Sequence, residues 1–409
     1  MNIMERDILR RLVTEYMEAA SLPVQREKIR LWKALNRSRM ERPMITIDQL
    51  PWNELACEEL ALQIGDPYWR GVENNLRQTL YKWRYFAVDM VLDPFISIPK
   101  ALHHTGYGLH SREETIGAAD STAKSYHFIN QLESLEDVRK ITDYHITHDE
   151  AETARRMAEA ADLFGDIAPA VPMGHTFHLG IWDIISGYMG VDNAYIAFMD
   201  NPDLLHAAME RLTQATLCAI EDANACGGHN DNANICHCSY IYTDELLPDS
   251  GTGGGPRSEN CWAFGLAQLF TSISPAMFEE FELPYISRMA EKFGMIYYGC
   301  CDRLDDRLDI VKRIPHVRKV SCSPWSDRAH FAAEIGPKLI MSNKPTPALL
   351  ATDSFDEDAV RRDLELTCRL AKENGVNLEF LLKDISTVRG DPHRLTRWAD
   401  TAMRVVEAW

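Results

Sequence analysis

Short apolar runs alternate with amphipathic stretches along most of this chain. A short apolar run bounded by turn residues is typical of a buried strand, and apolar positions at helical spacing are typical of a helix. The predicted strands are 86–92, 167–173, 234–240, 295–298, 318–322, 338–342 and 377–382. The predicted helices are 134–164, 179–189, 201–224, 274–293, 303–314, 326–335, 355–374 and 392–408. Such alternation predicts an α/β fold built on a mainly parallel sheet.

Two α/β arrangements fit this order of elements. The preferred one is a (β/α)8 TIM barrel over 86–409, preceded by an N-terminal helical extension over 1–85, where Ile8, Leu9 and Leu12 repeat at helical spacing. The alternative is an open, doubly wound sheet. The sequence contains neither of the glycine patterns that bind nucleotide phosphates, so it does not favour the open sheet. The glycine-rich run 251–255 is expected to be a loop.

Charge and cysteine content narrow the class of protein. The 409 residues include 61 acidic and 43 basic side chains, a net charge of −18, and no Lys/Arg run forms a basic face. This argues against nucleic-acid binding. No apolar run approaches the roughly 20 residues that span a bilayer, and the amphipathic N-terminus does not resemble a signal peptide. Ten cysteines are too few for a disulfide scaffold, so we expect a cytoplasmic protein with free or metal-bound thiols.

Side chains suited to chemistry follow the predicted strands at their carboxyl ends. In a barrel these positions share one rim, where active sites are found. A structural interpretation is open for each of them, because cysteines pack as small buried residues, a lone Lys is often exposed, and neighbouring Lys and Asp can pair with each other. The residues are His175, Cys236, His237, Cys238, Cys300, Cys301, Asp302, Cys322, Lys344, Lys383 and Asp384.

The thiols and the imidazole among them are candidate zinc ligands. Zinc held by such groups with one position open activates a thiolate or an alkoxide. Side chains alternate along a strand, so Cys236 and Cys238 are expected on one face and His237 on the other. The spacing is not that of a structural zinc module. We therefore expect at most a subset of these residues to share a zinc ion with the 300–302 segment.

Four segments of the chain resemble the uroporphyrinogen decarboxylase superfamily, which includes that decarboxylase and the zinc- and corrinoid-dependent methyltransferases. The segments are SPAMFEEFELPY (274–285), YYGCCD (297–302), SNKPTPALL (342–350) and LKDISTVRGDP (382–392). The resemblance runs from about residue 86 to the C-terminus. It implies a (β/α)8 barrel with its pocket at the carboxyl ends of the strands.

The resemblance also implies where zinc would bind. In the corrinoid-dependent branch the strand after the first of these segments ends in His-x-Cys, and the matching positions here are Tyr298 and Cys300. A second zinc-binding Cys is expected near the end of the last strand, where this chain has Lys383 and Asp384. The Arg-Gln-Ala-Gly-Arg-Tyr motif of the decarboxylase is absent. Either Cys301, Asp302 or His237 completes the zinc set with Cys300, or the chain binds no zinc.

The first functional hypothesis is transfer of a methyl group from a small methylated substrate to a corrinoid carried by a partner protein. A metal or an acid such as Asp384 would make the demethylated atom a better leaving group. The N-terminal helices would serve a homodimer or dock the corrinoid protein. The expected catalytic residues are Asp384, Lys383, Asp302 and His175, the substrate-binding residues Tyr298, Lys344 and Arg303, and the metal ligands Cys300, Cys301 and His237.

Two alternatives stay open. One is a metal-independent decarboxylase or lyase, in which Lys344, Lys383 and Arg303 hold the carboxylates of a small or tetrapyrrole substrate. The other is a barrel that binds a ligand without catalysis. The thiol and ionic groups at the strand ends favour an enzyme, because charged groups are costly to keep in a pocket that no longer uses them.

Overall fold

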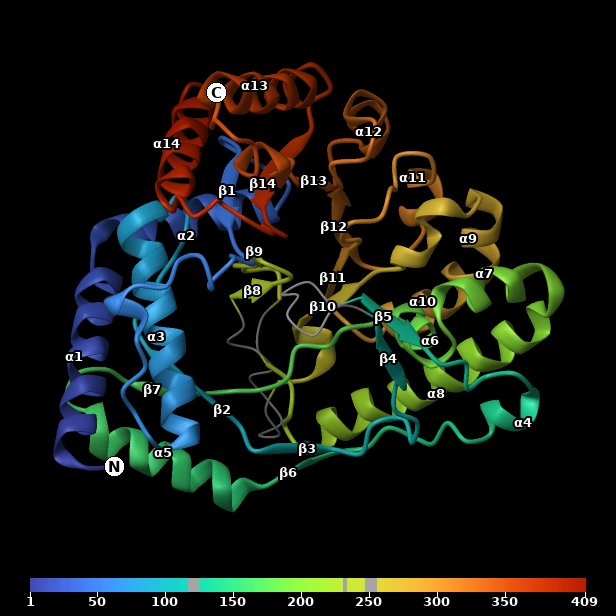
Figure 1. The fold of residues 1–409 in the computed structure, drawn as a ribbon, viewed down its shortest axis with the longest axis horizontal. Helices are drawn as coiled ribbons and strands as arrows, with labels where there is room; N and C mark the ends of the chain where they lie inside the picture. The colour runs from blue at the N-terminus through green and yellow to red at the C-terminus, as the bar shows by residue number, and fades with distance from the viewer. Residues whose placement is uncertain (117–124, 231–233, 247–255) are drawn as a thin grey trace.

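A curled sheet of six parallel strands lies at the centre of the molecule (Figure 1). The structure is a computed structural model that describes residues 1–116, 125–230, 234–246 and 256–409. Neighbouring strands of this sheet are all parallel, as the sequence pattern predicted. All six carboxyl ends therefore meet at one edge. The order across the sheet is β1 (Met44–Ile47), β14 (Asn377–Leu382), β13 (Ile340–Asn343), β12 (Val317–Cys322), β11 (Met295–Tyr298) and β10 (Trp262–Gly265).

A second parallel pair continues the curve beyond β10. It consists of β2 (Ile96–Pro99) and β7 (Ala170–Met173). The chain after β7 runs beside β10, because the Leu179 N–H donates to the Phe264 carbonyl oxygen over 2.7 Å and His178 forms a parallel bridge to Phe264. The strand pairings of the described residues do not join β1 to β2. The six strands thus form a half-barrel. Among the described residues, no strand pairing closes the expected (β/α)8 barrel.

The first 85 residues contain three helices, a short strand and the loops over 37–66 that join them. Helices α1 (Ile3–Ala20) and α3 (Pro67–Phe86) pack with α5 (Glu150–Phe164) around β2 in a separate apolar core. The helix α2 (Pro23–Asn36) lies between α1 and β1 in the chain. The expectation of an all-helical segment is wrong at β1, whose four residues are all buried and pair with β14. A division into domains at residue 85 stays a prediction.

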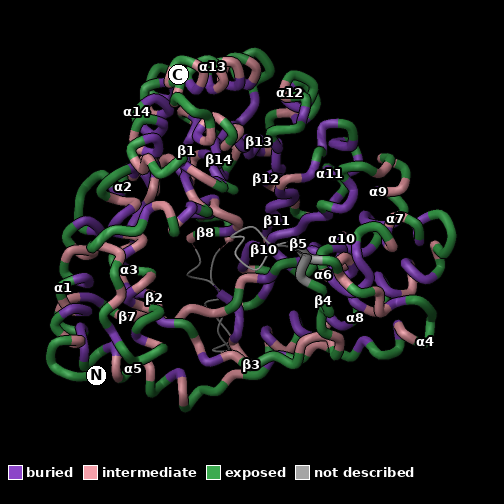
Figure 2. The backbone as a smooth tube through the Cα atoms, viewed as in Figure 1, coloured by how far each residue is buried: buried purple, intermediate pink, exposed green. Residues whose placement is uncertain are grey.

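Helices cover the outer side of the sheet, and their exposed positions face away from the buried strands (Figure 2). The predicted helix over 274–293 is divided into α9 (Pro275–Phe281) and α10 (Leu283–Ala290), because Pro284 has no N–H for the helical hydrogen bond. The remaining helices are α4 (Leu135–Val138), α6 (Ile181–Met189), α7 (Val191–Asp200), α8 (Pro202–Ala225), α11 (Leu308–Val311), α12 (Arg328–Ile335), α13 (Glu357–Glu373) and α14 (His393–Glu407). The other paired strands are β3 (Leu102–His104) with β6 (Ile146–His148) and β4 (Glu113–Ile116) with β5 (Ser125–Phe128).

A hairpin made of β8 (Ile235–Cys236) and β9 (Ser239–Tyr240) lies on the concave side of the sheet (Figure 1). Its turn residues, His237 and Cys238, have φ angles of 47° and 66°. The predicted strand over 234–240 is therefore wrong, because left-handed backbone at two successive residues reverses the chain. The predicted strand over 86–92 is wrong as well, because these residues do not form a β-strand. Strand β10 was not predicted.

A charged pair is buried below this hairpin. Lys319 Nζ lies 2.7 Å from Glu379 Oε2, and both side chains are fully buried. The Ser239 hydroxyl of the hairpin donates to Glu379 over 2.8 Å and accepts from Lys319 over 2.6 Å. Side chains alternate along strands, so Ser321 and Lys383 lie on the same concave face, nearer the carboxyl ends. The concave face therefore carries charged and hydroxyl groups from the Lys319–Glu379 pair to the carboxyl ends, beside the apolar side chains that pack under the hairpin.

Within the part of the chain that the structure describes, no helix combines the length and apolar character needed to cross a membrane. The glycine-rich run 251–255 lies outside the described residues.

Candidate active site

Two adjacent thiols stand where β11 ends. Gly299 follows the strand with φ of 90°, and a Cβ there would meet Leu304 at 2.5 Å, so only glycine fits this reversal. The next residue, Cys300, is 5% exposed, whereas Cys301 is half-buried. The Cys300 N–H donates to Asp302 Oδ1 over 2.6 Å, and its carbonyl oxygen accepts from the Ser321 hydroxyl. These bonds hold the two sulfur atoms 3.5 Å apart.

The last strand brings an ammonium group to the first of these thiols. Lys383 Nζ lies 3.0 Å from Cys300 Sγ and 3.3 Å from His237 Nε2. The next residue, Asp384, accepts from the Cys301 thiol over 3.0 Å and lies 3.2 Å from Lys383 Nζ. The sequence interpretation placed these five residues at one rim, and the structure brings them into contact.

These contacts shift the pKa values of the two thiols in opposite directions. The Cys301 thiol, 3.5 Å away, lowers the pKa of Cys300, and His237 and Lys344 lower that pKa further. The contact with Cys300 and burial raise the pKa of Cys301. Burial alone would lower the pKa of Lys383, but the charge and hydrogen bond of Cys300 raise it overall. These shifts favour a thiolate at Cys300, an ammonium at Lys383 and a neutral thiol at Cys301.

A second lysine lies deeper on the concave face. Lys344 is buried and donates to the Tyr297 hydroxyl over 3.0 Å and to the Ser321 hydroxyl. The Tyr297 hydroxyl donates in turn to Ser342 over 2.7 Å. Burial lowers the pKa of Lys344, while the charge of Cys300 acts in the opposite direction. The sequence interpretation found Lys344 but not Tyr297 or the two serines that surround it.

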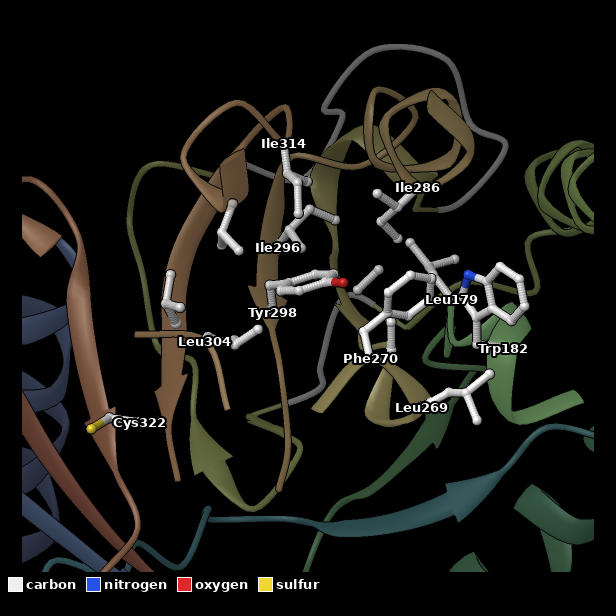
Figure 3. Close-up of a cluster of buried hydrophobic side chains, with 14 of the residues drawn as sticks. Leu179, Trp182, Leu269, Phe270, Ile286, Ile296, Tyr298, Leu304, Ile314 and Cys322 are labelled. Carbon is white, nitrogen blue, oxygen red and sulfur yellow. The ribbon is translucent and has the colours of Figure 1, made fainter. Parts of the chain in front are cut away.

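Tyr298 and Arg303, which we expected to bind substrate, do not contact this group. Tyr298 points to the helix side of the sheet, among buried apolar side chains (Figure 3), and its hydroxyl donates to Glu282 over 2.9 Å. Arg303 pairs with Asp305 over 3.0 Å. The left-handed backbone at Gly299 explains the first difference, because it breaks the alternation that would have put Tyr298 on the Cys300 side.

The histidines after β7 are also placed differently from the prediction. His178 packs against Phe264, with ring centroids 5.0 Å apart, and Phe264 stacks on His237 at 3.8 Å. The charge of Cys300 acts on the pKa of His178, which burial lowers. The predicted catalytic residue, His175, instead packs against Phe177. The structure therefore connects His178 rather than His175 to the thiol pair.

Three acidic side chains lie behind the thiols. Asp302 is buried, its Oδ2 has no hydrogen-bond partner within the described chain, and burial raises its pKa. Burial also raises the pKa of Asp183 to about 6 and that of Glu282 to about 8. The sequence interpretation found Asp302 but neither of the others, since each lies in or beside a helix without a local signal.

The donor atoms near Cys300 do not fit a zinc ion as they are arranged. Among the described residues, no group of three or more His, Cys, Asp or Glu side chains is positioned to hold a metal. The ammonium of Lys383 lies within hydrogen-bond distance of two of the expected ligands, Cys300 and His237. A cation placed between them would meet that positive charge. Lys383 thus brings a positive charge beside Cys300 and His237.

Comparisons with known proteins show the fold alone. No family model and no curated protein matches the sequence. Among solved structures, the chain is similar to a methyltransferase from Methanosarcina mazei, with a TM-score of 0.50 and 12% sequence identity. The match covers 91% of this chain and 96% of that chain. The half-barrel and its surrounding helices therefore have the arrangement seen in a methyltransferase.

Proposed function

We propose that this chain is a methyltransferase of the uroporphyrinogen decarboxylase superfamily that moves a methyl group from a small methylated substrate to a corrinoid carried by a partner protein. The observation that carries the proposal is the Lys383 ammonium, held 3.0 Å from Cys300 at the carboxyl ends of the strands. The fold similarity to a methyltransferase supports it. Six strands of the sheet and the β2–β7 pair supply eight parallel strands, the number that a closed barrel requires.

Transfer of a methyl group from a heteroatom leaves that atom with an extra electron pair. The atom departs more readily if a proton reaches it as the bond to carbon breaks. Lys383 is the acid proposed for this step, because its ammonium is held at the carboxyl ends of the strands, where the substrate would bind. Asp384 and His237 hold the ammonium in place from two further sides. The methyl acceptor is a reduced corrinoid on the partner, a strong nucleophile toward methyl carbon.

Methyl transfer can be measured with free cob(I)alamin as the acceptor. Purified protein is mixed with cob(I)alamin and a panel of methoxylated aromatics, methylamines and methyl thioethers, and methylcobalamin is followed by its absorbance. We expect Lys383→Met to lower the rate about 10²-fold or more, the contribution typical of a general acid. The matched control is Lys338→Met, which changes an exposed lysine outside the site.

Two outcomes would count against the proposal. One is the absence of methylcobalamin with every donor while an established methyltransferase works in the same assay. The other is an equal rate for Lys383→Met and Lys338→Met. Elemental analysis of the same preparation shows whether zinc is present. The proposed proton transfer does not require zinc.

A metal-independent decarboxylase is the second candidate, and Lys344 is the observation that favours it. This buried ammonium contacts hydroxyl groups, and the charge of Lys383 adds to the lowering of its pKa by burial. Two neighbouring cations are suited to hold a carboxylate. The test is release of CO2 from a panel of polycarboxylates. Release by the wild type that is lost in Lys344→Met would favour this function over methyl transfer.

A further inference from the structure

We propose that Cys300 and Cys301 form a modification site at which a peroxide oxidises the two adjacent thiols to a disulfide. The site stands on the contacts of the two sulfur atoms and goes beyond the proposed methyl transfer. The sulfur atoms lie 3.5 Å apart, and each has its own charged partner. The arrangement matches that of redox-sensitive cysteines, in which a stabilised thiolate stands beside a second, resolving thiol.

Cys300 is the sulfur that reacts first. A thiolate attacks peroxide far faster than a thiol does, and an ammonium within hydrogen-bond distance stabilises the thiolate. Lys383 Nζ is in that position. The cysteines Cys236, Cys261 and Cys322 are also buried. Burial raises the pKa of Cys236 and of Cys322, so burial by itself does not make a thiol of this protein reactive.

Cys301 is the resolving thiol. It is more exposed than Cys300, so it lies on the side from which solvent reaches the pair. Its S–H already donates to Asp384 Oδ2 over 3.0 Å. The carboxylate can therefore receive the proton when the Cys301 sulfur forms a new bond. The pair thus provides the nucleophile, the second thiol and a proton acceptor.

The oxidation proceeds in two balanced steps. The Cys300 thiolate attacks one oxygen of hydrogen peroxide, the O–O bond breaks, and the hydroxide that leaves takes a proton from solvent to become water. Cys300 is then a sulfenic acid. The Cys301 S–H passes its proton to Asp384 as its sulfur attacks the Cys300 sulfur, the S–O bond breaks, and the departing hydroxide takes that proton from Asp384 and leaves as water. Two sulfur atoms lose two electrons in total, and one peroxide becomes two waters.

The disulfide is expected to be easy to reduce again. Adjacent Cα atoms are about 3.8 Å apart, which is shorter than the roughly 4.4–6.8 Å found across ordinary disulfides. Strained disulfides are reduced more readily. Oxidation also removes the thiolate from Lys383. The modification therefore reversibly changes the charge at the site.

The test uses the reduced full-length protein treated with one equivalent of hydrogen peroxide. Mass spectrometry of the digested protein should show the peptide with Cys300 and Cys301 lighter by two hydrogens, while the exposed Cys57 stays reduced. In Cys301→Ser, dimedone should trap Cys300 as a sulfenic acid. In Lys383→Met, oxidation should slow about tenfold, the effect of raising the thiol pKa by one unit above the assay pH. Circular dichroism confirms that each variant is folded.

The proposal is overturned if Cys300 and Cys57 oxidise at equal rates, or if the wild-type peptide gains oxygen without losing hydrogen. Restoration of the original mass by dithiothreitol is the expected last step, and failure of that restoration would contradict the strained disulfide. None of these readouts depends on methyl transfer. Loss of the proposed function would leave them unchanged.

Discussion

At the scale of single residues, the contact between Lys383 and Cys300 decides the character of the site. It joins the end of the last strand to the end of β11, 83 residues earlier in the chain. The charge of Cys300 raises the pKa of Lys383, whose ammonium lies within hydrogen-bond distance of the Cys300 sulfur. His237 contacts Lys383 and lowers the pKa of Cys300. A substitution of Lys383 should therefore change the reactivity of the Cys300 thiol even without a substrate.

The reactivity of Cys300 toward iodoacetamide tests this contact. The Lys383 charge favours the thiolate, so Lys383→Met should raise the pKa of Cys300 and move half-maximal alkylation upward by about one pH unit or more. Mass spectrometry of the alkylated peptide over a pH series measures the shift. Lys338→Met should give the wild-type profile. A profile unchanged in Lys383→Met would show that the lysine does not stabilise the thiolate.

Sequence reasoning identified the residues that meet at the thiol pair because each follows an apolar run, and the carboxyl ends of parallel strands converge. It assigned Tyr298 to the substrate site because Tyr298 matches the His of the His-x-Cys pattern in the resembling family, although the left-handed glycine puts Tyr297 on the Cys300 side. It chose His175 over His178, since two histidines three positions apart in a loop give no indication of which one turns toward β10.

At the scale of elements, the junction of α9 and α10 places an acid in the core. Glu282 stands where Pro284 interrupts the helix, and it is buried against Tyr298. Burial raises its pKa from 4.5 to about 8. The folded chain thus keeps this carboxyl protonated while the unfolded chain ionises it, so stability falls as the pH rises from about 4.5 to about 8.

Replacement of Glu282 by Gln should remove much of this pH dependence. The amide keeps an acceptor for Tyr298 but does not ionise. We expect urea unfolding at about pH 5 and about pH 8 to give more similar free energies for Glu282→Gln than for the wild type. The exposed neighbour Glu279→Gln is the matched control and should keep the wild-type difference. An equal pH dependence in both variants would contradict the assignment.

Strands β11 to β14 were predictable because each is a short run of mostly buried residues between clear helices. Strand β10 was missed because no predicted helix directly precedes Trp262–Gly265. The 234–240 segment was read as a single strand because nothing in Cys-His-Cys marks a turn. Its left-handed residues are not glycines, and the Ser239, Lys319 and Glu379 contacts that accompany the hairpin come from segments far apart in the sequence.

At the scale of the whole molecule, the two ends of the chain meet in the sheet. Strand β1 pairs with β14, and α14 packs against α3. A chain without residues 1–85 would lose β1 and leave the paired edge of β14 unsatisfied, together with the apolar residues that α1 and α3 cover.

Deletion of residues 1–85 should therefore abolish cooperative unfolding or soluble expression. Thermal unfolding followed by circular dichroism measures this, with deletion of residues 1–2, which precede α1, as the control. A truncated chain that unfolds cooperatively near the wild-type temperature would show that the remaining strands and helices fold independently, as a separate N-terminal extension would require.

The pairing of β1 with β14 also sets an order of events during synthesis. The ribosome completes β1 more than three hundred residues before β14 emerges, so the first strand of the sheet has to wait for the strand with which it pairs. Contacts of such long sequence separation slow folding. During translation, the four buried residues of β1 need temporary cover from the neighbouring helices or from a chaperone, and the mouth of the half-barrel acquires Lys383 only at the end.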